Sequence, residues 1–193
     1  DAAGCSNAPV TFTTTTATAG TLQWQVDSGT GFIDLVNGGV NSISGVTGTT
    51  LTYTALTGED GYKFRCVISN CTNTVTSDEV TLTVNESPVI TSINQQQSIC
   101  VSGDAVFSVT ATGVGLTYQW QYYTGSYSDL SDAGLYGGTS TSTLSITGAD
   151  NTLAELFGGG DEAYYQAIIS SSNGCLINTG LNTLCVSVKL PVI

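Results

Sequence analysis

Histidine and methionine are absent from the 193-residue sequence, and proline and basic residues are scarce, with three of each. Without histidine, the chain cannot form a Cys2His2 zinc site or the Ser-His and Cys-His pairs of many hydrolases. The basic residues Lys63, Arg65 and Lys189 stand against 15 acidic ones, which gives a net charge of −12. Because such a surface repels phosphate groups, we expect neither nucleic acid nor an anionic membrane surface as a partner.

Long apolar runs are missing too, since no segment approaches the roughly 18 residues that cross a bilayer. We therefore expect no direct membrane insertion, and any attachment to a cell outside these residues. The chain begins at Asp1 with neither methionine nor an apolar signal segment, as in a mature product or an excerpt. Its six cysteines, an even number, and its few lysines indicate an oxidising, extracellular or cell-surface setting.

A strand pattern centred on tryptophan occurs twice, at residues 22–26 and 118–122. In both copies large apolar residues alternate with glutamines, which is the period of a strand with one buried face. The central residues, Trp24 and Trp120, are natural core anchors between two packed sheets. The doubled pattern predicts an all-β chain of two domains, residues 1–85 and 86–193, with a short polar linker at 85–88.

The segment around Cys66 carries the most specific motif. Asp60, Phe64 and Cys66 follow the Asp-x-x-x-Tyr-x-Cys pattern that opens strand F of an immunoglobulin domain, with phenylalanine at the corner tyrosine. The second half keeps the tyrosine, as Tyr165, but not the cysteine. Because Thr14 occupies the strand B position that would pair with Cys66, we expect a buried thiol. The predicted fold class is two tandem immunoglobulin-like β-sandwich domains.

Four cysteines repeat between the halves: Cys5 matches Cys100, and Cys71 matches Cys175. Because these positions persist together, we infer that the first class bonds to the second. One bridge within each domain is the simplest version. In an immunoglobulin topology, however, the two positions lie about 30 Å apart, too far for a disulfide. In the other version Cys5 bonds to Cys175, and Cys100 faces Cys71 of a following copy. The sequence leaves both versions open.

The two ends of the chain suggest how copies assemble. Pro88-Val89-Ile90 opens a full first strand in domain two, whereas domain one has four residues before Cys5, too few for that strand. Pro191, Val192 and Ile193 repeat the tripeptide after the last strand, as the start of a spare one. Since an open sheet edge invites pairing with another chain, Cys5 and Pro191-Val192-Ile193 form the predicted assembly edge. The alternative is an excerpt of a longer tandem array, cut between repeats.

With the Tyr-x-Trp-Gln strand, the Asp-x-x-x-Tyr motif and the matched cysteines in view, the chain resembles the tandem immunoglobulin-like repeats of large surface adhesins from gliding, type IX-secreting bacteria. The resemblance covers nearly the whole chain. It implies an extracellular stalk, fibre or adhesive module without catalytic activity.

Two further groups of residues are candidates for binding beside the assembly edge. Tyr123, Tyr127 and Tyr136 crowd one region of domain two, where exposed rings could stack on sugars. Calcium at the domain junction is a weaker hypothesis, and its candidate ligands are Glu86, Asp104, Asp129 and Asp161. The acidic pairs at 78–79 and 161–162 lie at expected turns, where solvated carboxylates are normal.

We therefore expect a non-enzymatic structural or adhesive protein without a cofactor. In the first hypothesis copies of the chain assemble head-to-tail into a surface fibre or stalk through open edges and terminal strand pairing. In the second the chain is a glycan-binding adhesin module from a longer array.

Overall fold

A computed structural model describes residues 1–16, 19–94, 96–100, 102–149, 153, 162–180 and 184–189. The chain divides into two compact units, Asp1–Ser87 (unit 1) and Pro88–Ile193 (unit 2). This division falls two residues beyond the boundary expected from the linker.

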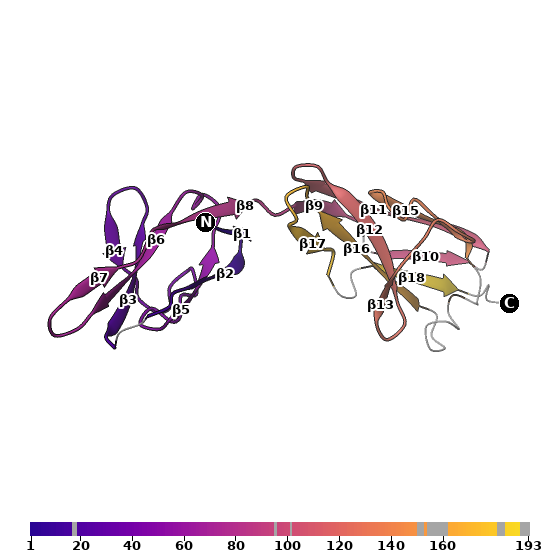
Figure 1. Ribbon diagram of the computed structural model, residues 1–193. Helices are drawn as coiled ribbons and strands as arrows, with labels where there is room; N and C mark the ends of the chain where they lie inside the picture. Colours follow the sequence, from indigo (N-terminus) through magenta and orange to yellow (C-terminus); the bar gives the residue numbers. More distant parts are fainter. Residues whose placement is uncertain are drawn as a thin grey trace. The chain divides into compact units, whose positions relative to one another are not determined.

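Unit 1 contains eight described strands in two sheets (Figure 1). They are β1 (Ala2–Cys5), β2 (Ala8–Thr13), β3 (Thr21–Asp27), β4 (Phe32–Asp34), β5 (Thr50–Ala55), β6 (Lys63–Ser69), β7 (Thr74–Thr76) and β8 (Val80–Asn85). The larger sheet has the order β1-β8-β6-β3-β4, with β7 also on β6, and the smaller one consists of β2 and β5. β1 runs parallel to β8, while the other pairs are antiparallel.

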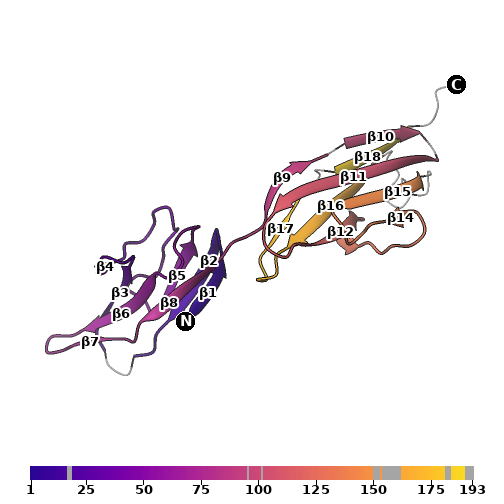
Figure 2. The same ribbon diagram turned by 90° about the horizontal axis from the view of Figure 1, so that it is seen from above.

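Unit 2 repeats this plan with two additional strands in its smaller sheet. Its strands are β9 (Val89–Ile93), β10 (Gln96–Cys100), β11 (Gly103–Thr112), β12 (Thr117–Tyr123), β13 (Tyr127–Asp129), β14 (Tyr136–Gly137), β15 (Thr143–Ala149), β16 (Glu162–Ser170), β17 (Leu176–Asn178) and β18 (Leu184–Lys189). The larger sheet has the order β10-β18-β16-β12-β13, and the smaller one is β14-β15-β11-β9. Figure 2 shows β9 running along β11, and β10 along β18.

Each unit packs its two sheets around a separate apolar core. Trp24 and Trp120 lie at the centre of these cores, with 2% and 0% of their surface exposed. Each indole N–H is satisfied, since Nε1 of Trp24 donates to the Gly48 carbonyl (2.9 Å) and that of Trp120 to the Thr141 carbonyl (2.8 Å). The two-sheet arrangement with a buried tryptophan on β3 and on β12 confirms the predicted immunoglobulin-like fold.

The glutamines of the repeated motif fasten neighbouring strands to each other. Nε2 of Gln23 donates to the carbonyls of Trp24 and Leu35, both at 2.9 Å, which ties β3 to the end of β4. Gln119 makes the same two bonds with Trp120 and Leu130 in unit 2. The Gln-Trp motif is therefore accounted for by the fold.

The two units hold strand F, which is β6 in unit 1 and β16 in unit 2, by different contacts. In unit 2 the hydroxyl of Tyr165 contacts that of Tyr136 at 3.2 Å. In unit 1 Phe64 has no hydroxyl and instead stacks on Phe12, with ring centroids 4.3 Å apart. A hydrogen-bonded carboxylate supplies the polar contact, because Glu59 accepts bonds from the Tyr53 hydroxyl, the Asn41 amide and the Leu56 backbone N–H.

Two features of unit 1 differ from the sequence-based expectation. The run from Val10 to Thr18, rich in threonine and β-branched residues, favours a strand over its whole length. In the structure β2 ends at Thr13, and residues 17–18 lie outside the described part. The residues before Cys5 do form a strand, β1. It pairs in parallel with β8, as β10 pairs with β18, and so corresponds to the second strand of unit 2 and not to the first.

Candidate functional site

In the described part of the chain, the smaller sheet of unit 1 lacks the strand that β9 supplies in unit 2. The pairs Phe12–Leu51 and Phe107–Leu144 show that β2 and β11 hold equivalent places. In unit 2 β11 lies between β15 and β9, whereas β2 has β5 as its one neighbour in the described sheet. The outer edge of β2 is therefore the position that β9 occupies in the other unit.

The backbone polarity of this edge follows from the strand register. The amide of Thr14 donates to the Thr49 carbonyl at 2.9 Å, so even-numbered residues bond toward β5. Because hydrogen-bonding direction alternates along an antiparallel strand, Thr11 and Thr13 direct their N–H and C=O groups away from β5. The side chains of Thr11, Thr13 and Thr15 are exposed.

Unit 2 covers the equivalent backbone groups with two polar side chains as well as with β9. Gln97 bonds to both the N–H (2.8 Å) and the C=O (2.6 Å) of Val106. Asn94 accepts from the Ser108 amide (2.5 Å), and its own backbone N–H donates to the Ser108 carbonyl (3.1 Å). Counting back from the matched cysteines, unit 1 has Ala2 in place of Gln97, and alanine cannot make these bonds.

Four described cysteines fall into two chemical states. Cys5 and Cys175 each take part in a disulfide. Cys66 and Cys71 carry free thiols, the first buried and the second exposed. The buried thiol at Cys66 was predicted, and burial raises its pKa. Since Cys71 is free, a Cys5–Cys71 bridge within unit 1, the simplest predicted pairing, is not formed. Nothing is described of the Cys100 side chain.

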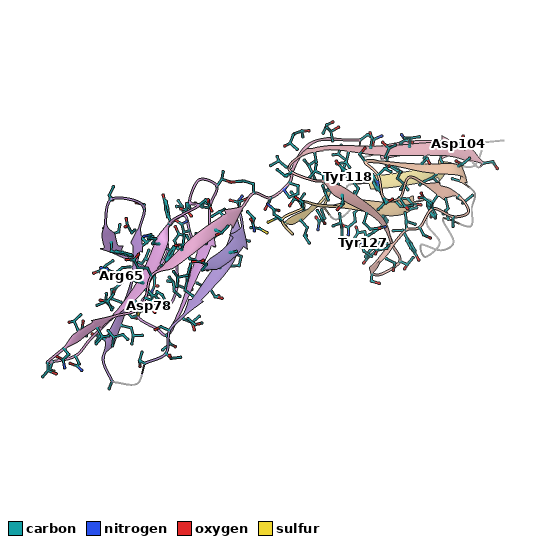
Figure 3. The ribbon with its side chains drawn as sticks, turned by 45° about the horizontal axis from the view of Figure 1, so that its top comes forward. Arg65, Asp78, Asp104, Tyr118 and Tyr127 are labelled. Carbon is teal, nitrogen blue, oxygen red and sulfur yellow. The ribbon has the colours of Figure 1, made fainter. Side chains whose placement is uncertain are left out.

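Two of the three predicted tyrosines lie together. Tyr123 and Tyr127 face each other across the β12–β13 pair, with ring centroids 5.0 Å apart, and Tyr123 is 37% exposed. Figure 3 shows Tyr127 at this hairpin. Tyr136 instead packs against the core and contacts Tyr165, and burial raises its pKa.

The predicted calcium ligands are engaged in separate local bonds. Asp104 accepts from the Gly148 amide and Asp129 from the Gln121 amide, and Asp104 lies away from the hairpin that carries Asp129 (Figure 3). Glu86 in unit 1 accepts from the Thr57 hydroxyl. Asp161 lies outside the described residues. Within the described ranges, no group of three or more Cys, Asp or Glu side chains could hold a metal ion.

The structure describes one part of the predicted assembly edge, Cys5. Pro191, Val192 and Ile193 lie outside the described residues, whereas Cys5 ends β1 beside Asn85 of β8. In the part of the chain that the structure describes, no helix has the length and apolar character needed to cross a bilayer.

Comparison with known proteins gives one related sequence and several related folds. No protein-family model matches the chain. A stretch of 116 residues, 58% of the chain, is 36% identical to Endoglucanase C of Cellulomonas fimi, and the match spans 10% of that protein's length.

The solved structures that resemble the chain are similar at low identity. Extracellular domains 3–5 of Drosophila OTK share 17% identity over 98% of this chain and 59% of theirs, with a TM-score of 0.47. The tandem Ig repeats of Dlar share 15% identity over 97% and 92% of the two chains, with a TM-score of 0.44. The insect immune protein hemolin shares 17% over 97% and 44%, also with a TM-score of 0.44.

The sequence predicted that domain one lacks its first strand, but it did not indicate which strand would carry the exposed edge. The signal for the location of that edge is the loss of one amide side chain, because Gln97 lies three residues before Cys100 whereas Ala2 lies three residues before Cys5.

Proposed function

We propose that this chain is a non-enzymatic extracellular structural or adhesive module whose copies associate head-to-tail through open sheet edges and terminal strand pairing. The observation that carries the proposal is the two-stranded β2–β5 sheet of unit 1, set against the four-stranded sheet of unit 2. Exposed strand edges pair readily with other chains unless charge, proline or a covering segment protects them.

The side chains of the described residues support a role without catalysis. The sequence has no histidine to act as a general base. The carboxylate with the most hydrogen bonds described above, Glu59, holds the turn before β6, and Glu79 forms a half-exposed ion pair with Lys63 at 3.2 Å. Each of these groups therefore has a structural partner.

An extracellular setting agrees with the redox state of the cysteines. Disulfides persist in oxidising compartments and are rare in the cytosol. Cys5 and Cys175 each take part in a disulfide. The resemblance to surface adhesins of gliding bacteria fits the same proposal, in which the chain forms part of a fibre or stalk.

Sedimentation velocity of the purified chain, combined with negative-stain images of the same samples, tests the assembly. We expect species larger than the monomer that grow with protein concentration, and filaments with a repeat of one chain. A chain that stays monomeric at concentrations of hundreds of micromolar would contradict head-to-tail assembly and favour an excerpt of a longer array.

A glycan-binding module is the second candidate, and two observations favour it. Tyr123 and Tyr127 form a paired aromatic surface at one hairpin, and aromatic rings stack on sugars. The related stretch of Endoglucanase C belongs to a protein whose name denotes action on a glucan. Binding of the chain to insoluble cellulose and to a glycan array should then be lost in Tyr123→Ala and Tyr127→Ala. Tyr62→Ala, in the other unit, serves as the control, and equal binding by all variants would contradict this role.

A further inference from the structure

We propose that β2 pairs with β2 of a second copy, antiparallel and across a two-fold axis, which joins two smaller sheets into one sheet of order β5-β2-β2-β5. This side-by-side contact goes beyond the proposed head-to-tail association, because the same strand serves on both sides and the contact closes with two chains. The register of β9 on β11 would place Pro191-Val192-Ile193 opposite residues 16–18. The proposed terminal pairing thus leaves Thr11 and Thr13 to another partner.

The unused hydrogen-bonding groups of β2 belong to Thr11 and Thr13. Because the Thr14 amide bonds to Thr49 beside β5, the N–H and C=O groups of Thr11 and Thr13 point to the other side of the strand. In the part of the chain that the structure describes, no hydrogen bond reaches these groups. Their counterparts in unit 2 are bonded by two amide side chains. Unit 1 therefore leaves exposed a backbone edge that unit 2 covers.

Unit 2 also shows that a strand fits on this side of the smaller sheet. There β9 lies antiparallel to β11, with Ser92 opposite Thr110. β2 holds the place of β11 in unit 1, and its core-facing side chains, Val10 and Phe12, are already buried, with 6% and 4% of their surface exposed. An added strand can therefore bond to the edge of β2 without any rearrangement of the core.

Antiparallel pairing centred on Phe12 uses the outward groups of both copies. Thr11 then lies opposite Thr13 of the second copy, and Thr13 lies opposite its Thr11. Opposite residues of this kind exchange both of their backbone bonds, so two such pairs make four N–H···O bonds. All the pairing residues lie inside β2 (Ala8–Thr13). Pro9 ends the ladder at the next outward position, because proline offers no N–H.

The side chains of β2 suit a strand that meets itself. In a two-fold contact the same surface is present on both sides, so a charge near the axis meets an equal charge. Residues 2–26 contain no charged side chain, although the chain carries a net charge of −12. Thr11 and Thr13 are exposed, and threonines opposite each other on neighbouring strands stabilise a sheet. The edge also lacks the charged side chains that usually prevent such pairing.

Hydrogen exchange of single amides, measured by NMR over a range of concentrations of the full chain, tests the pairing. We expect the Thr11 and Thr13 amides to exchange at least tenfold more slowly where two chains associate than in the dilute monomer. The Thr14 amide, already bonded to Thr49, should change little and serves as an internal reference. Exchange of the Thr11 and Thr13 amides that does not depend on concentration would overturn the inference.

Two variants of one residue test whether the backbone makes the contact. Thr13→Pro removes the outward N–H while leaving the bonds between β2 and β5, and Thr13→Val keeps that N–H and the β-branched shape. We expect the association constant for two chains, from sedimentation, to fall at least tenfold in the proline variant and to stay within about threefold of the parent in the valine variant. Circular dichroism checks that both are folded. Equal association by the two folded variants would contradict pairing through β2.

Charged pairs test the register. Thr11→Lys with Thr13→Lys places like charges opposite each other in the paired strands, whereas Thr11→Lys with Thr13→Glu places a lysine opposite a glutamate. We expect at least tenfold weaker association of the double-lysine variant. Its two added lysines lower the net negative charge, so a general charge effect would strengthen association instead. Equal or stronger association of the double-lysine variant would contradict this register.

A chain lacking residues 191–193 separates this inference from the proposed function. We expect this chain to form a species of two chains and nothing larger, and the full-length Thr13→Pro variant to keep the head-to-tail association. If the truncated chain stays monomeric while the full chain forms filaments, the pairing of β2 is wrong and head-to-tail assembly stands. If both chains stop at two copies and Thr13→Pro abolishes that species, the pairing stands and head-to-tail assembly is wrong.

Discussion

Cys66 and Cys71 both carry free thiols, but the first is buried and the second is exposed. Cys66 replaces the disulfide of an immunoglobulin core with a packed thiol, and 0% of its surface is exposed. Cys71 follows the end of β6 and is exposed. Because the thiolate is the reactive form, burial and a raised pKa both protect Cys66.

Iodoacetamide should therefore modify Cys71 of the folded chain and leave Cys66 unmodified. We expect Cys66 to react only after denaturation, when its thiol gains solvent and an ordinary pKa. Peptide mapping by mass spectrometry after short labelling measures both sites separately. Rapid modification of Cys66 under native conditions would show that the core of unit 1 opens readily, and a Cys71→Ser variant controls for the exposed site.

Two buried hydroxyls give the chain a predictable response to alkali. Burial raises the pKa of Tyr165, and the neighbouring Tyr136 adds to the effect. A tyrosine whose pKa in the folded chain lies above its unfolded value of about 10 contributes stability that is complete below pH 10 and is lost as pH rises beyond it. Unit 2 should therefore become less stable above about pH 10.

Thermal unfolding followed by circular dichroism between pH 8 and pH 11.5 tests this expectation. The melting temperature should hold up to about pH 9 and then fall. Tyr165→Phe lowers the melting temperature at pH 8 if the hydroxyl contact matters, but it should flatten the alkaline decline. A decline of the same slope in the variant would assign the alkaline sensitivity to other groups.

At the scale of elements, strands with a strong period of two were predicted correctly and those without one were missed. The alternating segments 22–26 and 118–122 lie within β3 and β12, and Trp24 and Trp120 are buried as expected. β1 has the sequence Ala-Ala-Gly-Cys, which shows no apolar alternation, and only the parallel pairing with β8 makes it a strand. Such pairing depends on residues about 80 positions away, as in Ala2 and Leu82, so no local pattern reports it.

The location of the candidate site also depends on pairing between strands that lie far apart in the sequence. The sequence indicated that a strand is missing from domain one, because a tripeptide and a segment length could be compared between the repeats. Identifying β2 as the exposed edge required knowing that β1 corresponds to β10 and not to β9. That correspondence follows from the registers of four strand pairs.

Gly4 makes the close approach of β1 to β2 possible, and its replacement should loosen this edge. A Cβ atom added to Gly4 would overlap the Cγ2 atom of Val10. We expect Gly4→Ala to lower the free energy of unfolding of unit 1 by about 1–3 kcal/mol, as overpacked substitutions do. Urea unfolding followed by tryptophan fluorescence measures the change.

A double-mutant cycle with Val10→Ala identifies the cause of that loss. If the clash with Val10 is responsible, the double variant should be more stable than the sum of the two single changes predicts. Ala3→Ser, at an exposed position of the same strand, serves as the control and should change stability by less than about 0.5 kcal/mol. Additive effects in the cycle would show that Gly4 acts through the backbone and not through this contact.

At the scale of the whole molecule, the charge distribution determines the conditions under which copies can associate. Fifteen acidic residues against three basic ones make any two copies repel each other, whereas residues 2–26 contain no charged side chain. Attraction at the proposed edge comes from backbone bonds and apolar contacts, which salt does not screen. Repulsion between the net charges is long-ranged and is screened, with a Debye length of about 30 Å at 0.01 M salt and about 10 Å at 0.1 M.

Self-association should therefore strengthen with salt. We expect the association constant from sedimentation to rise severalfold between 10 mM and 300 mM sodium chloride, because screening removes repulsion and leaves the strand pairing intact. Calcium chloride at matched ionic strength separates screening from specific binding. An equal effect of the two salts supports screening, whereas a larger effect of calcium that a chelator reverses would show that acidic side chains of the assembly bind the ion. Weaker association at high salt would contradict the argument, since it would require attraction between opposite charges that 15 acidic and three basic residues can scarcely supply.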